Sequence, residues 1–446
     1  MIPPDTQYTR VGDSFVGYQV LGDGPIDLVH VTGMTGNIDT QWDLPPFARF
    51  LERLASFSRL IMFDRRGSGI SDSIALDALP TWETWIEDLT AVLDATGSER
   101  AAFLTEQDGG LWGLLFAATH PERTSALLLF NPWVRSLASE DNPGGFTREA
   151  IEARMTTWGE IWGTKAASAM GMPSYADDPE AIRALAKFYR SSLAPGAAFA
   201  QMRHLADVDA RDVLPSVRVP SLVMHRKDWN LIPAPVIRSV AEGIPGAQLV
   251  EVPGNDGAPW GSGWERIVDE IEGFLSDVRH GEEPNRILAT ILFTDIVGST
   301  ERAVDVGDKR WKELLSEHDR VARAQIERFR GRFVSTTGDG VVATFDGPGR
   351  AIRCAHSIGR ALRPAGIQIR AGLHTGEIEL REGDDIGGIA VHIAARVMAE
   401  AGPGEVVCSR TVKDLVAGSE FTFTDRGVCA LKGVPDQWQL HLVNAS

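Results

Sequence analysis

The sequence predicts two domains of different fold class, an α/β domain with a mostly parallel sheet and then an α+β domain rich in antiparallel strands. Before residue 280, continuous apolar runs recur between helical patterns, which is typical of strands buried on both faces of a parallel sheet. After residue 286, apolar and polar residues alternate or meet at tight turns. Residues 280–286 between them are polar and contain Gly and Pro, so we expect an exposed linker there.

Length, charge and cysteine content exclude several classes of protein. The chain has 446 residues, 43% of them hydrophobic, which is enough for the cores of two or more domains. A formal net charge of -17 without any run of Lys and Arg argues against nucleic acid or an anionic membrane as a partner. We expect a soluble, cytosolic protein, because no apolar stretch could span a bilayer and the first residues lack a signal-peptide core. The 3 Cys residues show no metal-binding spacing and suit a reducing compartment.

Six apolar runs predict the main strands of the first domain. They lie at residues 26–31, 59–63, 100–104, 126–130, 221–225 and 248–252. The stretch from about 133 to 217 interrupts this rhythm, because it is helical in pattern and rich in large side chains. We therefore predict an α/β domain over residues 1–279 in which residues 133–217 form an inserted helical cap.

The second domain, predicted over residues 287–446, begins with an apolar strand that leads to Asp295. The helix after it presents one apolar face, formed by Trp311, Leu314, Leu315, His318 and Val321. Residues 332–345 predict a hairpin whose tip carries Asp339. Residues 367–373 then alternate between apolar and polar, which is the period of a half-buried strand.

Residues 10–279 resemble the α/β-hydrolase family. The segment 64–71 (Asp-Arg-Arg-Gly-Ser-Gly-Ile-Ser) matches the family's turn after an early strand, and residues 30–33 (His-Val-Thr-Gly) lie where its oxyanion loop usually does. The family's reaction needs a nucleophile on a sharp elbow, an acid and a histidine base. Gln107, Trp229 and Gly257 stand at those three positions. Since an amide is not a usable nucleophile, the resemblance implies a hydrolase fold without its catalytic triad.

A capped pocket is what remains of such a site. We expect a small, largely apolar ligand to bind between cap and sheet and its occupancy to be passed to the second domain. The residues expected near it are Met34, Gln107, Trp133, Trp229 and Gly257. A structural or dimerising domain with a filled pocket is the alternative, because aromatic richness alone does not separate the two. An ester or lactone hydrolase is disfavoured by the three replaced positions.

Two carboxylates in the second domain suit a metal site. Residues 293–300 (Phe-Thr-Asp-Ile-Val-Gly-Ser-Thr) put Asp295 at a strand end, before a small-residue turn whose backbone amides suit polyphosphate. Asp339 comes from the hairpin tip. If the two strands are neighbours, both carboxylates and the phosphate oxygens form an oxygen-rich site for a pair of Mg²⁺ or Mn²⁺ ions.

Residues 287–446 resemble the class III nucleotide cyclase catalytic domain over their whole length, and the order of the two domains resembles bacterial fusions of an α/β-hydrolase-like domain with such a cyclase. The resemblance implies a ferredoxin-like core and a two-metal mechanism. Asp295, Asp339 and the backbone carbonyl of Ile296 would hold the metals. The ribose 3′-hydroxyl of ATP would then attack the α-phosphorus, and pyrophosphate would leave.

Other positions of the cyclase motifs are matched as well. Arg396 falls one helical turn after His392, which is the spacing of the family's Asn and Arg that stabilise the transition state. Because His392 replaces the Asn, we expect activity to be reduced and more pH-dependent. The residues that the resemblance and the turn assign to the phosphates are Arg370, Lys432, Gly298, Ser299 and Thr300.

Base recognition is assigned by the resemblance to Ser335 and Asp385, where adenylate cyclases have Lys and Asp. A serine hydroxyl donates or accepts, so it excludes guanine less decisively than an ammonium group does. ATP is the expected substrate, because a guanylate cyclase typically shows Glu and a small residue or Cys at these places. A loosely specific or guanylate cyclase is one alternative. A signalling protein whose degenerate cyclase domain only binds nucleotide is another.

In the cyclase family, the metal-binding residues and the set of His392, Arg396 and Lys432 come from different subunits. This chain carries both sets but a single cyclase domain, so we expect a head-to-tail homodimer with two equivalent sites. The leading hypothesis is an adenylate cyclase whose dimer geometry is regulated by a hydrolase-like sensor domain.

Overall fold

The computed structural model describes residues 3–75, 79, 81–140, 142–278, 286–380 and 385–444. The chain divides into two compact units, Met1–Pro80 with Thr84–Pro284, and Thr81–Glu83 with Asn285–Ser446. Of the predicted linker 280–286, residues 280–285 lie outside the described residues, and Arg286 is the first residue of a strand. No helix in the described ranges is long and apolar enough to cross a membrane.

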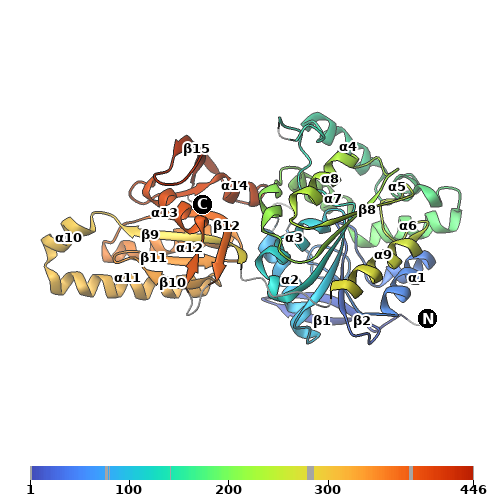
Figure 1. Ribbon diagram of the computed structural model, residues 1–446, viewed down its shortest axis with the longest axis horizontal. Coiled ribbons are helices and arrows are strands. Elements are labelled where there is room, and N and C mark those ends of the chain that lie inside the picture. Colours follow the sequence, from blue (N-terminus) through green and yellow to red (C-terminus); the bar gives the residue numbers. More distant parts are fainter. Residues whose placement is uncertain are drawn as a thin grey trace. The chain divides into compact units, whose positions relative to one another are not determined.

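The first unit is built on a twisted sheet that has eight strands in the described part of the chain, in the order β1-β2-β4-β3-β5-β6-β7-β8 (Figure 1). The strands are β1 (Gln7–Val11), β2 (Ser14–Leu21), β3 (Asp27–Val31), β4 (Arg59–Asp64), β5 (Ala101–Glu106), β6 (Thr124–Phe130), β7 (Ser221–Arg226) and β8 (Gln248–Val252). From β4 onward along the sheet every pair is parallel, whereas β1 pairs with β2 and β2 with β4 antiparallel. The predicted α/β class with a mostly parallel sheet is confirmed.

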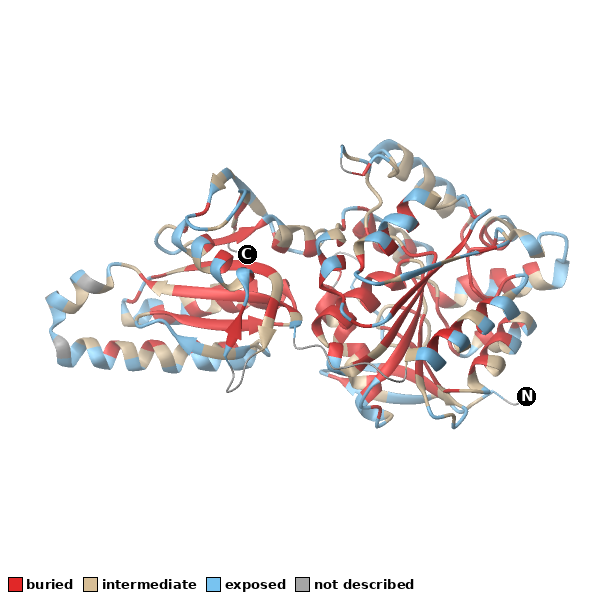
Figure 2. Cartoon of the chain, in the orientation of Figure 1, coloured by how far each residue is buried: buried red, intermediate tan, exposed pale blue. Residues whose placement is uncertain are grey.

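Strands β1 and β2 were not among the six predicted runs. They lie at one edge of the sheet, and β1 is largely exposed. An edge strand with one face in water alternates polar and apolar residues, so it lacks the continuous apolar run that identifies a central strand. Central strand β5, by contrast, is buried at every position (Figure 2).

Helices cover both faces of this sheet. Helices α1 (Pro45–Ala55) and α9 (Trp264–Asp277) pack against each other, and they lie across the sheet from α2 (Trp82–Ala95) and α3 (Gly109–Thr119) (Figure 1). Helix α8 (Ala234–Gly243) packs on β7 and β8. In α1 the buried residues are Phe47, Phe50, Leu51 and Leu54. That spacing forms one apolar stripe on an α-helix, which explains why the segment is helical and how it is oriented.

Between β6 and β7 the chain leaves the sheet and forms a helical layer. Its helices are α4 (Arg148–Ile161), α5 (Lys165–Gly171), α6 (Pro179–Ser192) and α7 (Pro195–Ala206). Two of them begin at side-chain caps, because Thr147 accepts from the Ala150 amide and Asp178 accepts from the amides of Glu180 and Ala181. We call this layer the cap.

The second unit contains a mixed sheet in the order β10-β11-β9-β12-β14-β16-β15, with β13 added beside β12. The strands are β9 (Arg286–Ile296), β10 (Arg332–Thr336), β11 (Val341–Phe345), β12 (Ile369–Leu380), β13 (Ile386–Gly387), β14 (Val406–Ser409), β15 (Phe423–Ala430) and β16 (Gln437–Val443). Strand β9 is central, since it pairs antiparallel with β11 on one side and with β12 on the other. The predicted antiparallel-rich α+β class is confirmed.

Helices lie on both faces of this second sheet. They are α10 (Ser299–Val306), α11 (Asp308–Arg328), α12 (Pro348–Leu362), α13 (Ile389–Ala399) and α14 (Arg410–Leu415). Helices α11 and α12 pack into the core cluster that contains Leu292, whereas α13 packs into the cluster that contains Phe293. Neighbouring residues of a strand face opposite sides, so α13 covers the other face. The predicted apolar face of α11 is confirmed, because Leu314 and His318 are buried against the core.

Asp64, at the end of β4, is buried within the first unit. Its Oδ2 accepts hydrogen bonds from the backbone amides of Ile38 at 3.1 Å and Ile70 at 3.0 Å. Its Oδ1 has no hydrogen-bond partner among the described residues. Burial is the dominant effect and raises the pKa of this carboxyl from 3.8 to about 7.

A raised pKa in the folded state makes stability fall as pH rises. Between 3.8 and about 7 the folded protein holds a proton that the unfolded chain has released. In this window the free energy of unfolding should therefore fall as pH rises. We expect Asp64→Asn, which cannot titrate, to make this fall shallower by up to about 1.4 kcal/mol per pH unit. Urea denaturation followed by tryptophan fluorescence checks this, since ten of the 12 Trp residues lie before residue 265. Exposed Asp13→Asn is the control, and equal slopes in both variants would contradict the prediction.

Candidate functional site

The two carboxylates predicted to bind metal come from neighbouring strands. Asp295 is the penultimate residue of β9, and β11 pairs with β9 so that Val342 faces Phe293. Continuing this antiparallel register by three residues places Asp339, in the β10–β11 hairpin, opposite Ile296. The strands that carry the two carboxylates are therefore neighbours, which is the condition on which the metal site was predicted.

The donor set around these carboxylates suits ions that are shared with a substrate. In the described ranges, no three His, Cys, Asp or Glu side chains cluster closely enough to hold an ion by themselves. Asp295 and Asp339 are both partly exposed, and the Ile296 side chain is buried, so only its backbone could serve as a ligand. Mg²⁺ typically binds to one or two carboxylates and completes its shell with water and phosphate oxygens. The residues present fit that arrangement.

Gly340 brings the hairpin close to β9. A Cβ atom at this position would lie 1.9 Å from the backbone oxygen of Thr294. The Thr294 hydroxyl in turn accepts a hydrogen bond from the Val341 amide at 3.2 Å. Only glycine permits so close an approach of two backbones, so Gly340 helps to place Asp339 beside the end of β9.

Arg370 lies directly opposite Asp295 in the pairing of β12 with β9. Its Nε and Nη2 atoms donate to Oδ2 of Asp295 at 2.9 and 2.5 Å. Asp295 alternates in phase with Phe293, so both charged side chains lie on the sheet face that α13 covers. The phosphate contact predicted for Arg370 stays a prediction. The structure adds a contact that sequence reasoning missed, since Arg370 orients Asp295, the first of the two carboxylates predicted to bind metal.

The turn after β9 presents backbone amides at the same edge. Gly298 adopts a left-handed φ of 65°, and α10 begins at Ser299. The amide of Arg302 makes the first bond of the helix, to the Gly298 oxygen at 3.0 Å. The amides of the preceding residues have no partner within α10 and are suited to phosphate. Thr300 belongs to this turn, but its side chain lies outside the described residues.

The second set of predicted residues is exposed and separate from the first. His392 and Arg396 lie on the exposed side of α13, one turn apart, and Lys432 is exposed between β15 and β16. In the part of the chain that the structure describes, none of the three forms a hydrogen bond or ion pair with Asp295 or Asp339. The fold of one chain therefore does not join the two sets by direct contact.

The residues predicted to recognise the base are also exposed. Ser335 lies in β10, next to an irregularity in its pairing with β11, and Asp385 immediately precedes β13.

Two exposed apolar residues lie on elements that carry or adjoin the set of His392, Arg396 and Lys432. Ile389 on α13 and Val428 on β15 have 54% and 57% of their surface exposed.

In the first unit, the three positions where a triad is predicted to be missing meet in space. Gln107 follows β5 with a left-handed φ of 49°, the sharp strand-to-helix turn on which hydrolase nucleophiles stand. Its amide Nε2 donates to the backbone oxygen of Gly257 at 3.0 Å. A Cβ atom on Gly257 would lie 2.8 Å from the Trp229 ring. Trp229 thus fills the space that any side chain at position 257 would need.

Asp108, which sequence reasoning missed, occupies the oxyanion position. Burial has the largest effect on this carboxyl and raises its pKa to about 6, while the nearby backbone amides of Met34 and of Asp108 itself act to lower it. In α/β hydrolases these are the two kinds of amide that bind the oxyanion. A Cβ atom on Gly33 would lie 2.4 Å from Oδ1 of Asp108, and its Oδ2 is buried without a hydrogen-bond partner among the described residues. An internal carboxyl group therefore lies at the position that the oxygen of a reacting ester would need. The sequence signal that could have identified Asp108 is its position directly after Gln107, since the amide of that position belongs to the oxyanion site in α/β hydrolases.

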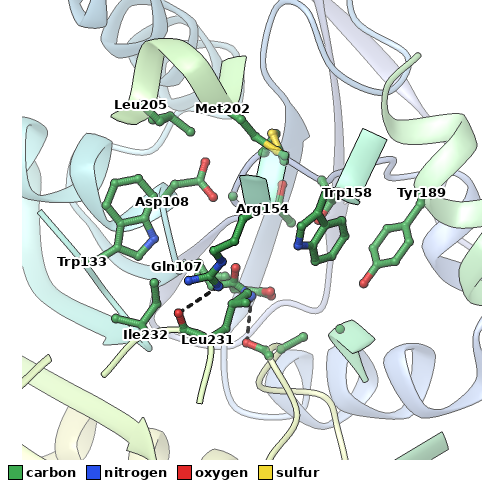
Figure 3. A pocket seen from close by; sticks show the side chains of 18 of the residues that line it. Gln107, Asp108, Trp133, Arg154, Trp158, Tyr189, Met202, Leu205, Leu231 and Ile232 are labelled. Atoms are coloured by element: carbon green, nitrogen blue, oxygen red, sulfur yellow. Dashed lines mark hydrogen bonds between the residues drawn. The ribbon is translucent and has the colours of Figure 1, made fainter. Parts of the chain in front are cut away.

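A cavity of about 220 Å³ lies between cap and sheet (Figure 3). The predicted residues Met34, Gln107, Trp133, Trp229 and Gly257 all line it. The cap adds Trp158, Met202 and Leu205, and the loop after β7 adds Leu231 and Ile232. The lining is largely apolar, with a few polar groups, as in small-molecule sites.

Comparison with known proteins assigns each unit to a fold. Residues 284–445 match the adenylate and guanylate cyclase catalytic domain family. The chain is 31% identical over 170 residues to "Putative adenylate cyclase 3" of Rhizobium meliloti, a match that spans 34% of this chain and only 27% of that protein. It is 29% identical over 254 residues to "Putative carbamate hydrolase RutD" of Azorhizobium caulinodans, spanning 55% of this chain and 89% of that one.

A solved structure agrees for the first unit. The enol-lactonase from Burkholderia xenovorans LB400 superposes with a TM-score of 0.50 at 19% identity, covering 60% of this chain and 100% of that one. The likeness shows an α/β-hydrolase fold for the first unit. It carries no activity across, since the fold supports many chemistries.

The packing of Gly257 against Trp229 and Gln107 leads to a stability prediction. We expect Gly257→Ala to lower the free energy of unfolding by about 1 to 3 kcal/mol, because the added methyl group overpacks the Trp229 ring. Urea denaturation followed by tryptophan fluorescence measures this. The matched control is Gly273→Ala in α9, where an added Cβ meets nothing within 4 Å. We expect that variant to be as stable as the wild type or more so. Equal free energies for the two variants would refute the packing argument.

Proposed function

We propose, for a chain whose residues 284–445 form an adenylate and guanylate cyclase catalytic domain behind an N-terminal α/β-hydrolase fold, that the protein converts ATP to 3′,5′-cyclic AMP and pyrophosphate. The observation that carries the proposal is the convergence of Asp295 and Asp339 at one edge of the second sheet, through the pairing of β9 with β11. Beside them lie the unpaired amides at the start of α10, a suitable place for a triphosphate.

The residues at this edge have distinct tasks in the proposed reaction. Asp295 and Asp339 would hold two Mg²⁺ or Mn²⁺ ions, which lower the pKa of the ribose 3′-hydroxyl and neutralise the triphosphate when bound. The 3′-oxygen forms a bond to the α-phosphorus, its proton is released, and the bond to the pyrophosphate oxygen breaks. Arg370 orients Asp295 through two hydrogen bonds. The turn at Gly298 positions the phosphates.

The remaining residues act from a second copy of the chain. Charge that develops on the transferred phosphoryl group needs fixed donors, and Arg396, His392 and Lys432 would supply them. Within one chain these residues are exposed and make no described contact with the carboxylates. A head-to-tail homodimer completes two equivalent sites and also covers Ile389 and Val428.

ATP is the proposed substrate rather than GTP. Asp385 can accept from the amino group of adenine, and the hydroxyl of Ser335 can donate to a ring nitrogen. Both side chains are exposed. Because a hydroxyl can also accept, discrimination against guanine is weaker than a lysine would give. A loosely specific cyclase is the second candidate, and Ser335 is the observation that favours it.

For the first unit we propose a ligand-binding domain that has lost hydrolase chemistry. Gln107 stands at the nucleophile elbow, and Trp229 fills the space of the base. Asp108 lies against the amides of the oxyanion position, so three separate requirements of ester hydrolysis are unmet. The cavity remains, and binding there would regulate the cyclase by favouring one dimer geometry over another.

The metal assignment predicts a loss of turnover in one variant. We expect Asp295→Ala to lower cyclic AMP production by at least about a hundredfold, because it removes a ligand of both proposed ions. The assay uses the full chain with ATP or GTP and Mg²⁺ or Mn²⁺. Glu313→Ala, at an exposed pair with Arg310 on α11, is the control and should keep full activity. Persistent turnover in Asp295→Ala would refute the metal assignment. If the wild type shows no turnover, the alternative is favoured in which the cyclase domain binds nucleotide without converting it.

The composite site predicts complementation between two inactive variants. Asp295→Ala and Arg396→Ala should each be inactive alone. In a coexpressed mixture, half of randomly formed dimers are mixed, and each mixed dimer keeps one site with all native residues. We therefore expect about a quarter of the wild-type turnover. Size-exclusion chromatography of the same sample checks that dimers form. If the mixture stays inactive although mixed dimers are present, the site does not lie between two copies.

A further inference from the structure

The cavity under the cap contains a cation that no described carboxylate neutralises. Arg154 of α4 is half-buried and donates from Nη2 to the backbone oxygen of Leu231 at 3.1 Å. Its guanidinium lies over the Phe146 ring at 4.4 Å from the centroid. Figure 3 shows the side chain directed into the cavity, close to Gln107 and Trp158. Burial lowers the pKa of Arg154.

The two acids of the cavity have other partners. Glu106 forms a hydrogen bond of 2.6 Å with His30, which is buried. Asp108 faces the amides of the oxyanion position, and the cation that most lowers its pKa is Arg65. Neither acid forms an ion pair with Arg154 in the described part of the chain. The cavity is therefore lined by two acids that do not pair with Arg154 and by one arginine that has no described carboxylate partner.

A guanidinium group has five N–H donors in a fixed planar array, and Arg154 uses one of them in a described hydrogen bond. Holding an unpaired charge away from water is costly, so such a group favours an anion as its neighbour. A carboxylate matches the array with two parallel hydrogen bonds. A phosphate ester carries more charge than one arginine can balance, and Arg154 is the only Lys, Arg or His among the described residues that line the cavity.

The rest of the lining defines the other end of the ligand. Around Arg154 lie aromatic and aliphatic side chains from the segment after β6, from the cap and from the loop after β7, namely Trp133, Trp158, Met202, Leu205, Leu231 and Ile232 (Figure 3). Burying hydrocarbon against such a surface releases water and is favourable. A cavity of about 220 Å³ suits a small molecule.

We propose that the first unit binds a small apolar carboxylic acid, whose carboxylate pairs with Arg154 and whose hydrocarbon part lies between the cap and Trp133. This inference rests on the proposed ligand-binding role of the first unit. It adds the chemical class of the ligand and the residue that selects it.

Three probes with the same tail test the head group. These are 4-phenylbutyrate, 4-phenylbutanol and 4-phenylbutylamine, titrated into the full chain by isothermal calorimetry. We expect the acid to bind at least about tenfold more tightly than the alcohol, because its carboxylate makes charge-assisted hydrogen bonds. The amine should bind most weakly, since its charge has the same sign as that of Arg154.

Variants of Arg154 identify the selecting group. Arg154→Gln keeps a donor but no charge, so the acid and the alcohol should bind equally, whereas Arg154→Lys should retain a preference for the acid. Arg183→Gln, exposed on α6 of the same cap, is the matched control and should bind as the wild type does. Circular dichroism confirms that each variant is folded.

Four outcomes would overturn the inference: equal affinity for acid and alcohol, a preference for the amine, no binding of any probe at millimolar concentration, or an unchanged preference in folded Arg154→Gln. A preference for the amine would identify Asp108 or Glu106 as the selecting group. Cyclase turnover that depends on Asp295 is measured without any probe. Failure of the ligand inference is therefore distinguishable from failure of the proposed cyclase activity.

Discussion

The pairing of β9 with both of its neighbours is the constraint on which the proposed catalytic site depends. One neighbour, β11, carries the hairpin that places Asp339 beside the end of β9, and the other, β12, places Arg370 opposite Asp295. A slip of one residue in either pairing would turn every side chain of the slipped strand to the other face. Buried clusters on both faces of the sheet make such a slip costly, so the hydrophobic core maintains the position of the charged groups.

The backbone of the first unit keeps the strand-to-helix turn of the α/β-hydrolase fold at Gln107, where the side chains form packing contacts and hydrogen bonds. Left-handed φ at a non-glycine residue costs roughly 1 to 3 kcal/mol, and Gln107 adopts it at the elbow. A hydrogen bond to Gly257 and the packing of Trp229 hold the turn in that conformation. The strained turn here lines the cavity and packs against Gly257.

The two units divide the proposed work between them. The second unit carries the two halves of the proposed composite site, and a single copy presents Asp295 and Arg396 without a described contact between them. In the proposed dimer, turnover would depend on how two copies meet. A ligand shifts an equilibrium only through different affinities for its states, so occupancy of the first unit's cavity would have to be linked to dimer geometry. Arg154, which has no described carboxylate partner, would give that cavity a chemical preference that apolar surface alone would not provide.

The sequence by itself determined the class of both units, the central strands and the residues of the cyclase motifs, because continuous apolar runs and closely spaced motifs are local properties of the chain. It also located Gln107, Trp229 and Gly257 as replaced positions. Only the tertiary structure decided that Arg370 pairs with Asp295, that Asp108 occupies the oxyanion position, and that Arg154 enters the cavity without a described carboxylate partner. Each of these contacts joins segments that are distant in the sequence or depends on the direction of one side chain. Strand register and burial determine which distant segments meet and where each side chain points, and no local sequence pattern indicates either.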